Sequence, residues 1–220
     1  CILGDEMGLG KTLQALGFIE TLRLNGCILS YSAPSSLNTQ YSVSKFTGCC
    51  NLHPVLIIAP LSTLLNWQKE ANMFTHASVA VLSGNNDDRN MFEMFETVSV
   101  CHNANSNLDN SSTTSSDKPK QVISREHRRN ASKEILLPKF HILITSYEML
   151  KSDFLKKLQF SVVIMDEGHR IKNDLAVTTA LVTQLKTDFR LILTGTPIQN
   201  NITELYSLLS FIDPQEFSSK

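Results

Sequence analysis

The sequence lacks several features that would place it in a specialised class of protein. Its 220 residues contain no apolar run of about 18 residues, the length that a membrane-spanning helix needs. They also carry no charged-then-apolar leader that would direct secretion. Five cysteines are too few and too scattered for a disulfide framework, which favours a reducing, intracellular environment. With 20 basic and 21 acidic residues, bulk charge gives no argument for a nucleic-acid partner.

The composition that remains is typical of one globular domain. Hydrophobic residues make up 42% of the chain and charged residues 19%, which is enough to build a single core. The chain begins without methionine, and an apolar, strand-like run starts at its second residue. We therefore read it as a fragment, truncated at its N-terminus.

Short apolar runs alternate with helical patterns along the chain. Strands are expected at residues 55–59, 79–82, 141–145, 162–165 and 191–194, and helices at 61–74, 87–97, 147–157, 174–186 and 203–212. Because the apolar runs are continuous rather than alternating, they predict a mainly parallel sheet covered by helices on both faces, an α/β fold. Two polar stretches, 27–53 and 101–137, interrupt this rhythm and are expected to be flexible insertions in surface connections.

A glycine-rich segment, Gly8-Leu9-Gly10-Lys11-Thr12, follows the first apolar run and precedes a helix-like stretch. Between a strand and a helix, such a segment binds phosphates through its backbone N–H groups and the positive N-terminus of the helix. Lys11 is then expected to reach the β- and γ-phosphates of a nucleotide, and Thr12 to ligate Mg²⁺. Asp5 stands where the strict G-x-x-x-x-G-K-[ST] pattern has its first glycine.

A pair of acidic residues, Asp166-Glu167, follows the apolar run 162–165 and so lies at a predicted strand end. A phosphate-binding loop needs one carboxylate to hold Mg²⁺, usually through water, and one to orient and deprotonate the attacking water. Asp166 suits the first role and Glu167 the second. The alternative, a loop-capping aspartate beside a solvated glutamate, is rejected because the loop at Lys11 supplies the partner site.

Five segments in order resemble a known family. GDEMGLGKT (4–12), IIAPLSTLLNWQKE (57–70), ITSYEML (144–150), MDEGHRIKN (165–173) and LTGTPIQNN (193–201) look like helicase motifs I, Ia, Ib, II and III. The residues of these motifs are similar to those of the SWI/SNF-type ATPases, which are superfamily-two translocases on double-stranded DNA. Members of that family remodel chromatin or displace proteins. In this family the first loop position is not glycine, so Asp5 is expected. The resemblance covers nearly the whole chain outside the two polar insertions.

The resemblance implies a RecA-like P-loop NTPase lobe that binds ATP and Mg²⁺. Lys11, Asp166 and Glu167 would be its catalytic residues, with Thr12 and Asp166 on the metal. The nucleotide-binding residues would be Asp5, Glu6, Met7, Gly8, Leu9, Gly10, Lys11 and Thr12. The residues that couple hydrolysis to movement would be His169, Thr194, Gly195 and Thr196.

The resemblance also implies contacts with DNA. Pro60, Leu61 and Ser62 in motif Ia, with Thr145 and Ser146 in motif Ib, fall where the family grips the backbone of one strand. Short hydroxyl side chains and free N–H groups at helix starts suit phosphates and carry no base information. Trp67 is expected to pack beneath the motif Ia helix rather than stack on a base. The implied partners are double-stranded DNA and nucleosomes or DNA-bound proteins, in the nucleus.

Other functions stay open at this point. An RNA helicase of the DEAH-box kind is disfavoured by Thr194-Gly195-Thr196, because those enzymes usually show Ser-Ala-Thr there. A truncated lobe that acts only as a binding scaffold is disfavoured by the chemically intact motifs. Gly168 gives the wording DEGH, which some repair and recombination members of the family share.

The family's working unit also has a second RecA-like lobe, which these 220 residues do not contain. That lobe supplies arginine fingers worth about 10³–10⁵ in rate in related phosphoryl-transfer systems. We therefore expect the fragment alone to be nearly inactive.

Overall fold

The computed structural model describes residues 1–6, 8–28, 53–101, 134–167, 180–195, 202–213 and 216–217. In chain order its elements are β1 (Ile2–Gly4), α1 (Lys11–Leu24), β2 (Val55–Ala59), η2 (Leu61–Thr63), α2 (Leu64–Phe74), β3 (Val79–Leu82), α3 (Asn86–Glu96), β4 (Thr97–Cys101), β5 (Glu134–Pro138), β6 (Ile142–Ser146), η3 (Tyr147–Lys151), α4 (Asp153–Lys157), β7 (Gln159–Asp166), β8 (Lys186–Thr194) and α6 (Ile202–Ile212).

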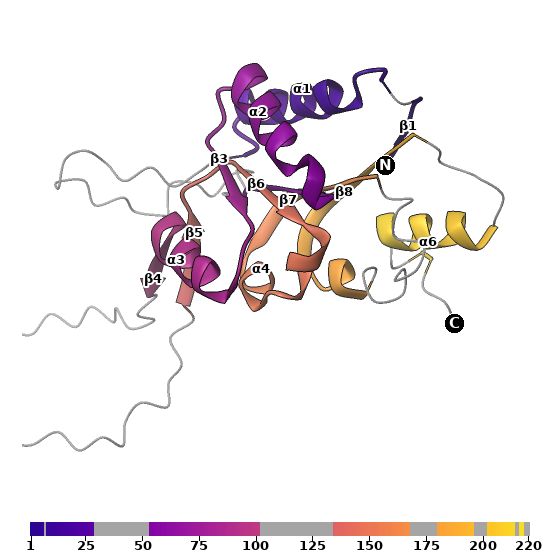
Figure 1. Ribbon diagram of the computed structural model, residues 1–220. Helices are drawn as coiled ribbons and strands as arrows, with labels where there is room; N and C mark the ends of the chain where they lie inside the picture. The colour runs from indigo at the N-terminus through magenta and orange to yellow at the C-terminus, as the bar shows by residue number, and fades with distance from the viewer. Residues whose placement is uncertain are drawn as a thin grey trace, which may run out of the picture.

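A six-stranded sheet forms the centre of the molecule, with the strand order β1-β8-β7-β2-β6-β3 (Figure 1). Every pair of neighbouring strands in it is parallel. All residues of β2 and β6 are buried, because strands in the middle of such a sheet have helices on both faces. The expected mainly parallel sheet is therefore confirmed.

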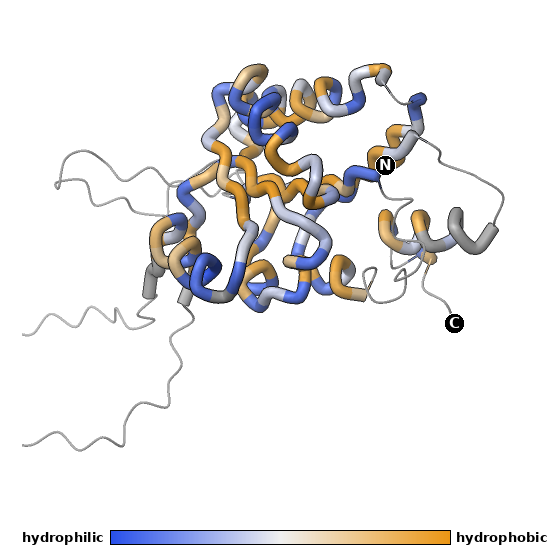
Figure 2. Tube along the Cα trace, in the orientation of Figure 1, coloured by the Kyte–Doolittle hydropathy of each residue, from blue (hydrophilic) through white to orange (hydrophobic). Residues whose placement is uncertain are grey.

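Helices cover both faces of this sheet. Alternate residues of β2 point to opposite sides: Val55 and Ile57 pack with residues of α1 and α2, whereas Leu56 and Ile58 pack with residues of α4 and α6. Figure 1 shows α1 and α2 above the sheet and α4 and α6 below it. Figure 2 shows the hydrophobic strands between these two layers. The expected α/β layered fold is confirmed.

Most expected elements occur where the apolar pattern placed them, with one break. Residues 55–59 and 79–82 are strands, and the expected helix 61–74 is the continuous pair η2 and α2. The expected helix 147–157 is interrupted at Ser152, whose backbone is extended with φ −70° and ψ 129°. The interruption makes two short helices, η3 and α4.

Three sequence-based boundaries differ from the structure. The helix expected at 174–186 cannot run to its last residue, because β8 begins at Lys186; positions 174–179 lie outside the described residues. Cys101 and residues 134–137, expected in a polar insertion, belong to the antiparallel hairpin of β4 and β5. Ile28, at the edge of the other insertion, is fully buried. The remainder of both insertions lies outside the described residues.

No helix within the described ranges is long and apolar enough to cross a membrane.

Candidate nucleotide and nucleic-acid site

The motifs converge because parallel strands all end at the same edge of a sheet. Gly4, the last residue of β1, pairs with Thr194 of β8, and Leu193 beside it pairs with Asp166 at the end of β7. Neighbouring strands lie about 4.8 Å apart, so the ends of β1 and β7 are separated by about 10 Å. The loop after β1 and the acidic pair after β7 therefore share one edge.

The loop between β1 and α1 has a backbone that depends on glycine. Gly8 and Gly10 have φ angles of 88° and 77°, in the left-handed region that glycine adopts without strain. Apart from the glycine itself and its chain neighbours, no heavy atom of the described segments lies within 4 Å of the position where a Cβ would stand on either residue. Gly10 is also the N-cap of α1. The N-terminus of a 14-residue helix thus follows a loop of the kind that binds phosphates.

The Lys11 ammonium is held at this loop by main-chain carbonyls. Its Nζ donates to the carbonyl oxygen of Asp5 at 2.8 Å and to that of Glu6 at 2.7 Å. An ammonium group has three N–H donors, so these two contacts leave one for a phosphate oxygen. Thr12, the next residue of the first turn of α1, is half-buried.

Asp166 is a half-buried carboxylate within reach of the charge on Lys11. Burial is the main reason that its pKa is raised, and the negative charge of Glu167 acts in the same direction. A hydrogen bond from Trp67, a main-chain hydrogen bond from Glu167 and the positive charge of Lys11 lower the pKa. Lys11 and Asp166 therefore interact electrostatically, although 155 positions separate them in the sequence.

Two hydrogen bonds to Asp166 were not foreseen from the sequence. The indole Nε1 of Trp67 donates to Asp166 Oδ2 at 2.8 Å, and the Tyr147 hydroxyl donates to the main-chain oxygen of Asp166. Trp67 is only 2% exposed, as expected for a residue packed beneath its helix. Neither contact has a local sequence signature, since Trp67 and Asp166 lie 99 positions apart.

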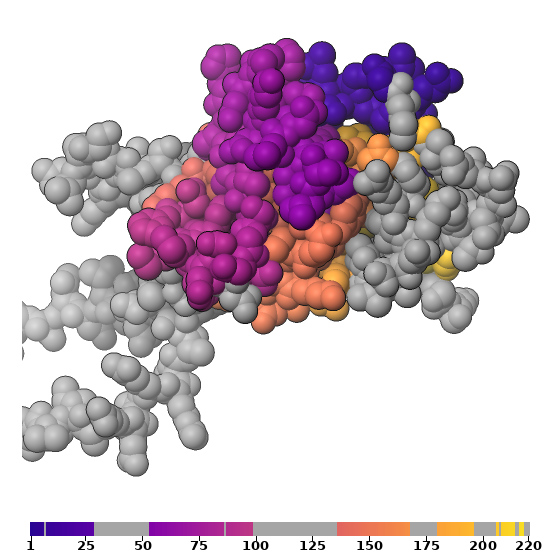
Figure 3. All heavy atoms as spheres, in the orientation of Figure 1, coloured from indigo at the N-terminus to yellow at the C-terminus, as the bar shows by residue number. Residues whose placement is uncertain are grey.

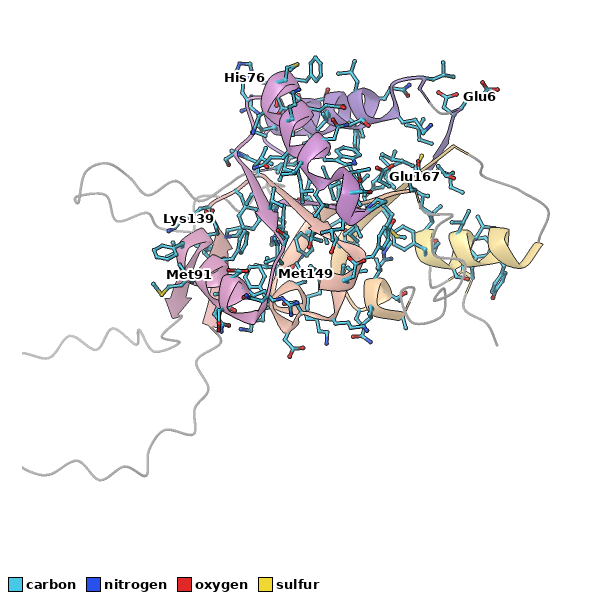
Figure 4. All side chains as sticks on the ribbon, in the orientation of Figure 1. Glu6, His76, Met91, Lys139, Met149 and Glu167 are labelled. Atoms are coloured by element: carbon cyan, nitrogen blue, oxygen red, sulfur yellow. The ribbon has the colours of Figure 1, made fainter. Side chains whose placement is uncertain are left out.

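Glu167 has an unusual backbone conformation for its residue type. Its φ of 55° is in the left-handed region, and it is the only non-glycine residue in the described segments with a positive φ. This conformation costs on the order of 1–3 kcal/mol and is frequent at functional sites. In Figure 4, Glu167 and Glu6 lie on the same side of the molecule. Lys139, which precedes β6 and so lies at the amino-terminal ends of the strands, is on the other side.

The residues expected to couple hydrolysis to movement are described only in part. Thr194 is 1% exposed at the end of β8, beside the half-buried Gly195. His169 and Thr196 lie outside the described residues, as do Met7 and Gly168. Their roles stay predictions.

In the first candidate DNA segment, residues 60–62, two of the three residues expected to contact DNA are exposed. Pro60 is buried, while Leu61, 63% exposed, and Ser62 lie on the surface at the start of η2. Ala59, the end of β2, pairs with Ser146, the end of β6, so the segments that follow these strands are neighbours. The space-filling view shows the violet atoms of η2 and α2 beside the orange atoms that follow β6 (Figure 3).

The second candidate DNA segment, Thr145 and Ser146, is less accessible to solvent. Thr145 is fully buried, and its hydroxyl donates to the carbonyl oxygen of Leu82 at 3.0 Å. Ser146 is 2% exposed. The Thr145 hydroxyl therefore stabilises the edge of the sheet, and for it to bind a DNA phosphate this hydrogen bond would have to break.

Comparison with known proteins identifies the family. A profile of the SNF2-related domain matches residues 1–220, the whole chain. The chain belongs to the SNF2-related domain family. This membership confirms the resemblance to SWI/SNF-type ATPases.

The SNF2-related domain has relatives among much longer proteins. It is 32% identical over 223 residues to human chromodomain-helicase-DNA-binding protein 6, covering 100% of this chain and 6% of that protein. It is 35% identical over 221 residues to the ATP-dependent DNA helicase DDM1 of Arabidopsis thaliana, covering 99% of this chain and 21% of that protein. The chain thus spans a small part of the relatives it matches.

Among solved structures, the domain resembles the SWI2/SNF2 ATPase core of Sulfolobus solfataricus in complex with double-stranded DNA. The identity is 25% and the TM-score 0.59, with 99% of this chain and 32% of that chain covered. A second structure of this ATPase core domain gives a TM-score of 0.60 at 24% identity. These matches confirm the expected RecA-like fold.

Proposed function

We propose that this domain is the ATP-binding lobe of a DNA-dependent ATPase that translocates on double-stranded DNA. One observation carries the proposal: the glycine-dependent loop that bears Lys11, at a helix N-terminus, and Asp166, at the end of β7, lie at the same edge of the sheet. A cation and a carboxylate so placed suit a magnesium–triphosphate complex. Family membership supports ATP as the nucleotide.

The residues at this edge fit ATP and Mg²⁺. Bound Mg·ATP would supply the γ-phosphoryl group that passes to water. Gly8 and Gly10 leave room for phosphate oxygens beside the loop, and Lys11 would exchange its carbonyl contacts for them. Thr12 and Asp166 would hold Mg²⁺, which typically takes one or two carboxylates, substrate phosphates and several waters. Glu167 would orient the attacking water and accept its proton.

Double-stranded DNA is the proposed track, and nucleosomes or other DNA-bound proteins are the proposed targets. The exposed η2 segment would follow the phosphate backbone, which carries no base information and so suits movement along any sequence. The named relatives include a chromodomain-helicase-DNA-binding protein and a DNA helicase, which favours chromatin and hence the nucleus.

The experiment that tests this function uses the full-length protein and its Glu167→Gln variant. We expect duplex DNA to stimulate ATP hydrolysis by the wild type, and the variant to lose at least about a hundredfold in rate, because a general base contributes about 10²–10⁴-fold. Glu148→Gln, at an exposed position of η3, is the matched control and should keep its rate.

Each alternative function predicts a different result in this assay. Stimulation by RNA and not by duplex DNA would replace the proposal with an RNA helicase-like ATPase. A protein that binds DNA equally well with and without Glu167, and hydrolyses no ATP, would be a scaffold. We further propose that the 220-residue lobe alone turns over slowly, since a second lobe would complete the site.

A further inference from the structure

Asp166 receives hydrogen bonds from the two segments that follow β2 and β6. Trp67, on α2, donates to its side chain, and Tyr147, the first residue of η3, donates to its main-chain oxygen. Each donor follows a candidate DNA segment closely. Trp67 lies one and a half helical turns beyond Ser62, and Tyr147 is adjacent to Ser146. One residue of the nucleotide site is thus held from both candidate DNA segments.

The Trp67 contact is mechanically stiff. The indole is 2% exposed and packs with Leu64 and Ala71 of the same helix in the core cluster on this face of the sheet. A close-packed side chain cannot change its position without moving its helix. α2 continues directly from η2, whose first residues are on the surface, so a shift of η2 would move the indole N–H with it.

We propose that Trp67 and Tyr147 are positioning residues that orient Asp166 for Mg²⁺ and connect it to both candidate DNA segments. This inference rests on the proposed function. The indole N–H fixes Oδ2, and because a carboxylate has about four lone-pair sites, this bond leaves capacity for the metal or its bound water. Tyr147 fixes the main chain of the same residue. DNA that moves η2, whose first residues are exposed, then changes how well Asp166 is placed, and nucleotide changes DNA affinity by the same factor.

The test is a binding measurement on the full-length protein that involves no hydrolysis. A fluorescent, non-hydrolysable ATP analogue is titrated at increasing Mg²⁺ concentration, with and without duplex DNA, against wild type, Trp67→Phe and Tyr147→Phe. Groups that orient a metal ligand typically contribute about 10–100-fold to metal affinity. We expect the Mg²⁺ concentration for half-maximal binding to rise about tenfold in Trp67→Phe, and about threefold in Tyr147→Phe, which loses one hydrogen bond to the main chain.

DNA provides the second readout. In the wild type, duplex DNA should change the affinity for the analogue by at least about fivefold, a typical coupling between sites. This factor should fall toward one in both variants. Leu64→Val, which trims the same face of α2, and Tyr206→Phe, which removes an exposed hydroxyl on α6, are the controls. They should keep the wild-type Mg²⁺ dependence and DNA response.

Thermal unfolding shows which variants are folded. If Trp67→Phe does not fold, Tyr147→Phe decides alone through its Mg²⁺ dependence and DNA response. An unchanged Mg²⁺ requirement and DNA response in the folded variants, or an equal change in Leu64→Val, would overturn the inference and leave the proposed function standing. A wild type that binds no analogue and shows no DNA-stimulated hydrolysis would instead overturn the proposed function.

Discussion

Replacing Thr145 by valine should destabilise the domain and leave its affinity for DNA unchanged. The Thr145 side chain is fully buried, and its hydroxyl donates to the carbonyl oxygen of Leu82 at 3.0 Å. Leu82 ends β3, one of the two edge strands of the sheet, whose one neighbour in the described residues is β6. The hydroxyl therefore fastens the end of an edge strand rather than facing solvent.

The expected magnitude follows from two opposing terms. Losing a buried hydrogen bond and leaving the Leu82 oxygen without this donor costs about 1–3 kcal/mol. Valine has the same branched shape as threonine, and its extra methyl group returns about 0.8 kcal/mol or less. We expect a net loss of about 1 kcal/mol in the free energy of unfolding.

Urea unfolding followed by the fluorescence of Trp67, the sole tryptophan of these 220 residues, measures this loss. Thr21→Val is the matched control, because the Thr21 hydroxyl also donates to a main-chain oxygen, that of Gly17, but from an exposed helix position. Its effect should stay below about 0.5 kcal/mol. If Thr145→Val lowers DNA affinity several-fold with no loss of stability, the hydroxyl binds DNA and the reasoning from burial is refuted.

Three further perturbations test the fold and the loop. The Arg23 side chain holds the pKa of Glu20 at about 2, below 4.5, so Glu20→Gln should be less stable than wild type at pH 7, and the difference should vanish as the pH falls from about 4.5 to 2. Equal differences at pH 7 and 2 in urea titrations would contradict this. Gly10→Ala, at φ 77°, should cost about 1–2 kcal/mol and weaken ATP binding, whereas Gly17→Ala inside α1 should be neutral or stabilising. If thermal unfolding shows Gly10→Ala to be stabilising and Gly17→Ala to be destabilising, the result would contradict the loop geometry. Ile57→Ala, in a fully buried strand, should cost about 2–5 kcal/mol in the same assay, and a loss below 1 would contradict the packing.

The sheet was predictable because its strands are buried on both faces. β2 consists of five consecutive apolar residues, and such a continuous run is typical of a strand in a parallel sheet that helices cover on both faces. The amino-terminal half of β8 was not predictable in this way, because Lys186 is exposed and Asp188 is polar and exposed, so their pattern resembled the end of a helix. Pairing with β7 decides the conformation there, and pairing is a long-range property.

The hairpin of β4 and β5 was missed for a related reason. Residues 135–137 are apolar but stand at the end of a long polar stretch, and their partner strand lies on the far side of that stretch. The clustering of the loop and the acidic pair was predictable, since strand ends of a parallel sheet meet at one edge. The donors from Trp67 and Tyr147 were not, because single side-chain contacts across the fold leave no local pattern.

The most direct test of one shared nucleotide–metal centre is a double-mutant cycle on Lys11 and Asp166. Full-length wild type, Lys11→Ala, Asp166→Asn and the double variant are compared in Mg²⁺-dependent binding of a non-hydrolysable ATP analogue. Two groups on one magnesium–triphosphate should show a coupling energy above about 1 kcal/mol, so the double variant loses less than the sum of the single losses. Losses that add within about 0.3–0.5 kcal/mol would show that the two residues act independently, and would contradict the account.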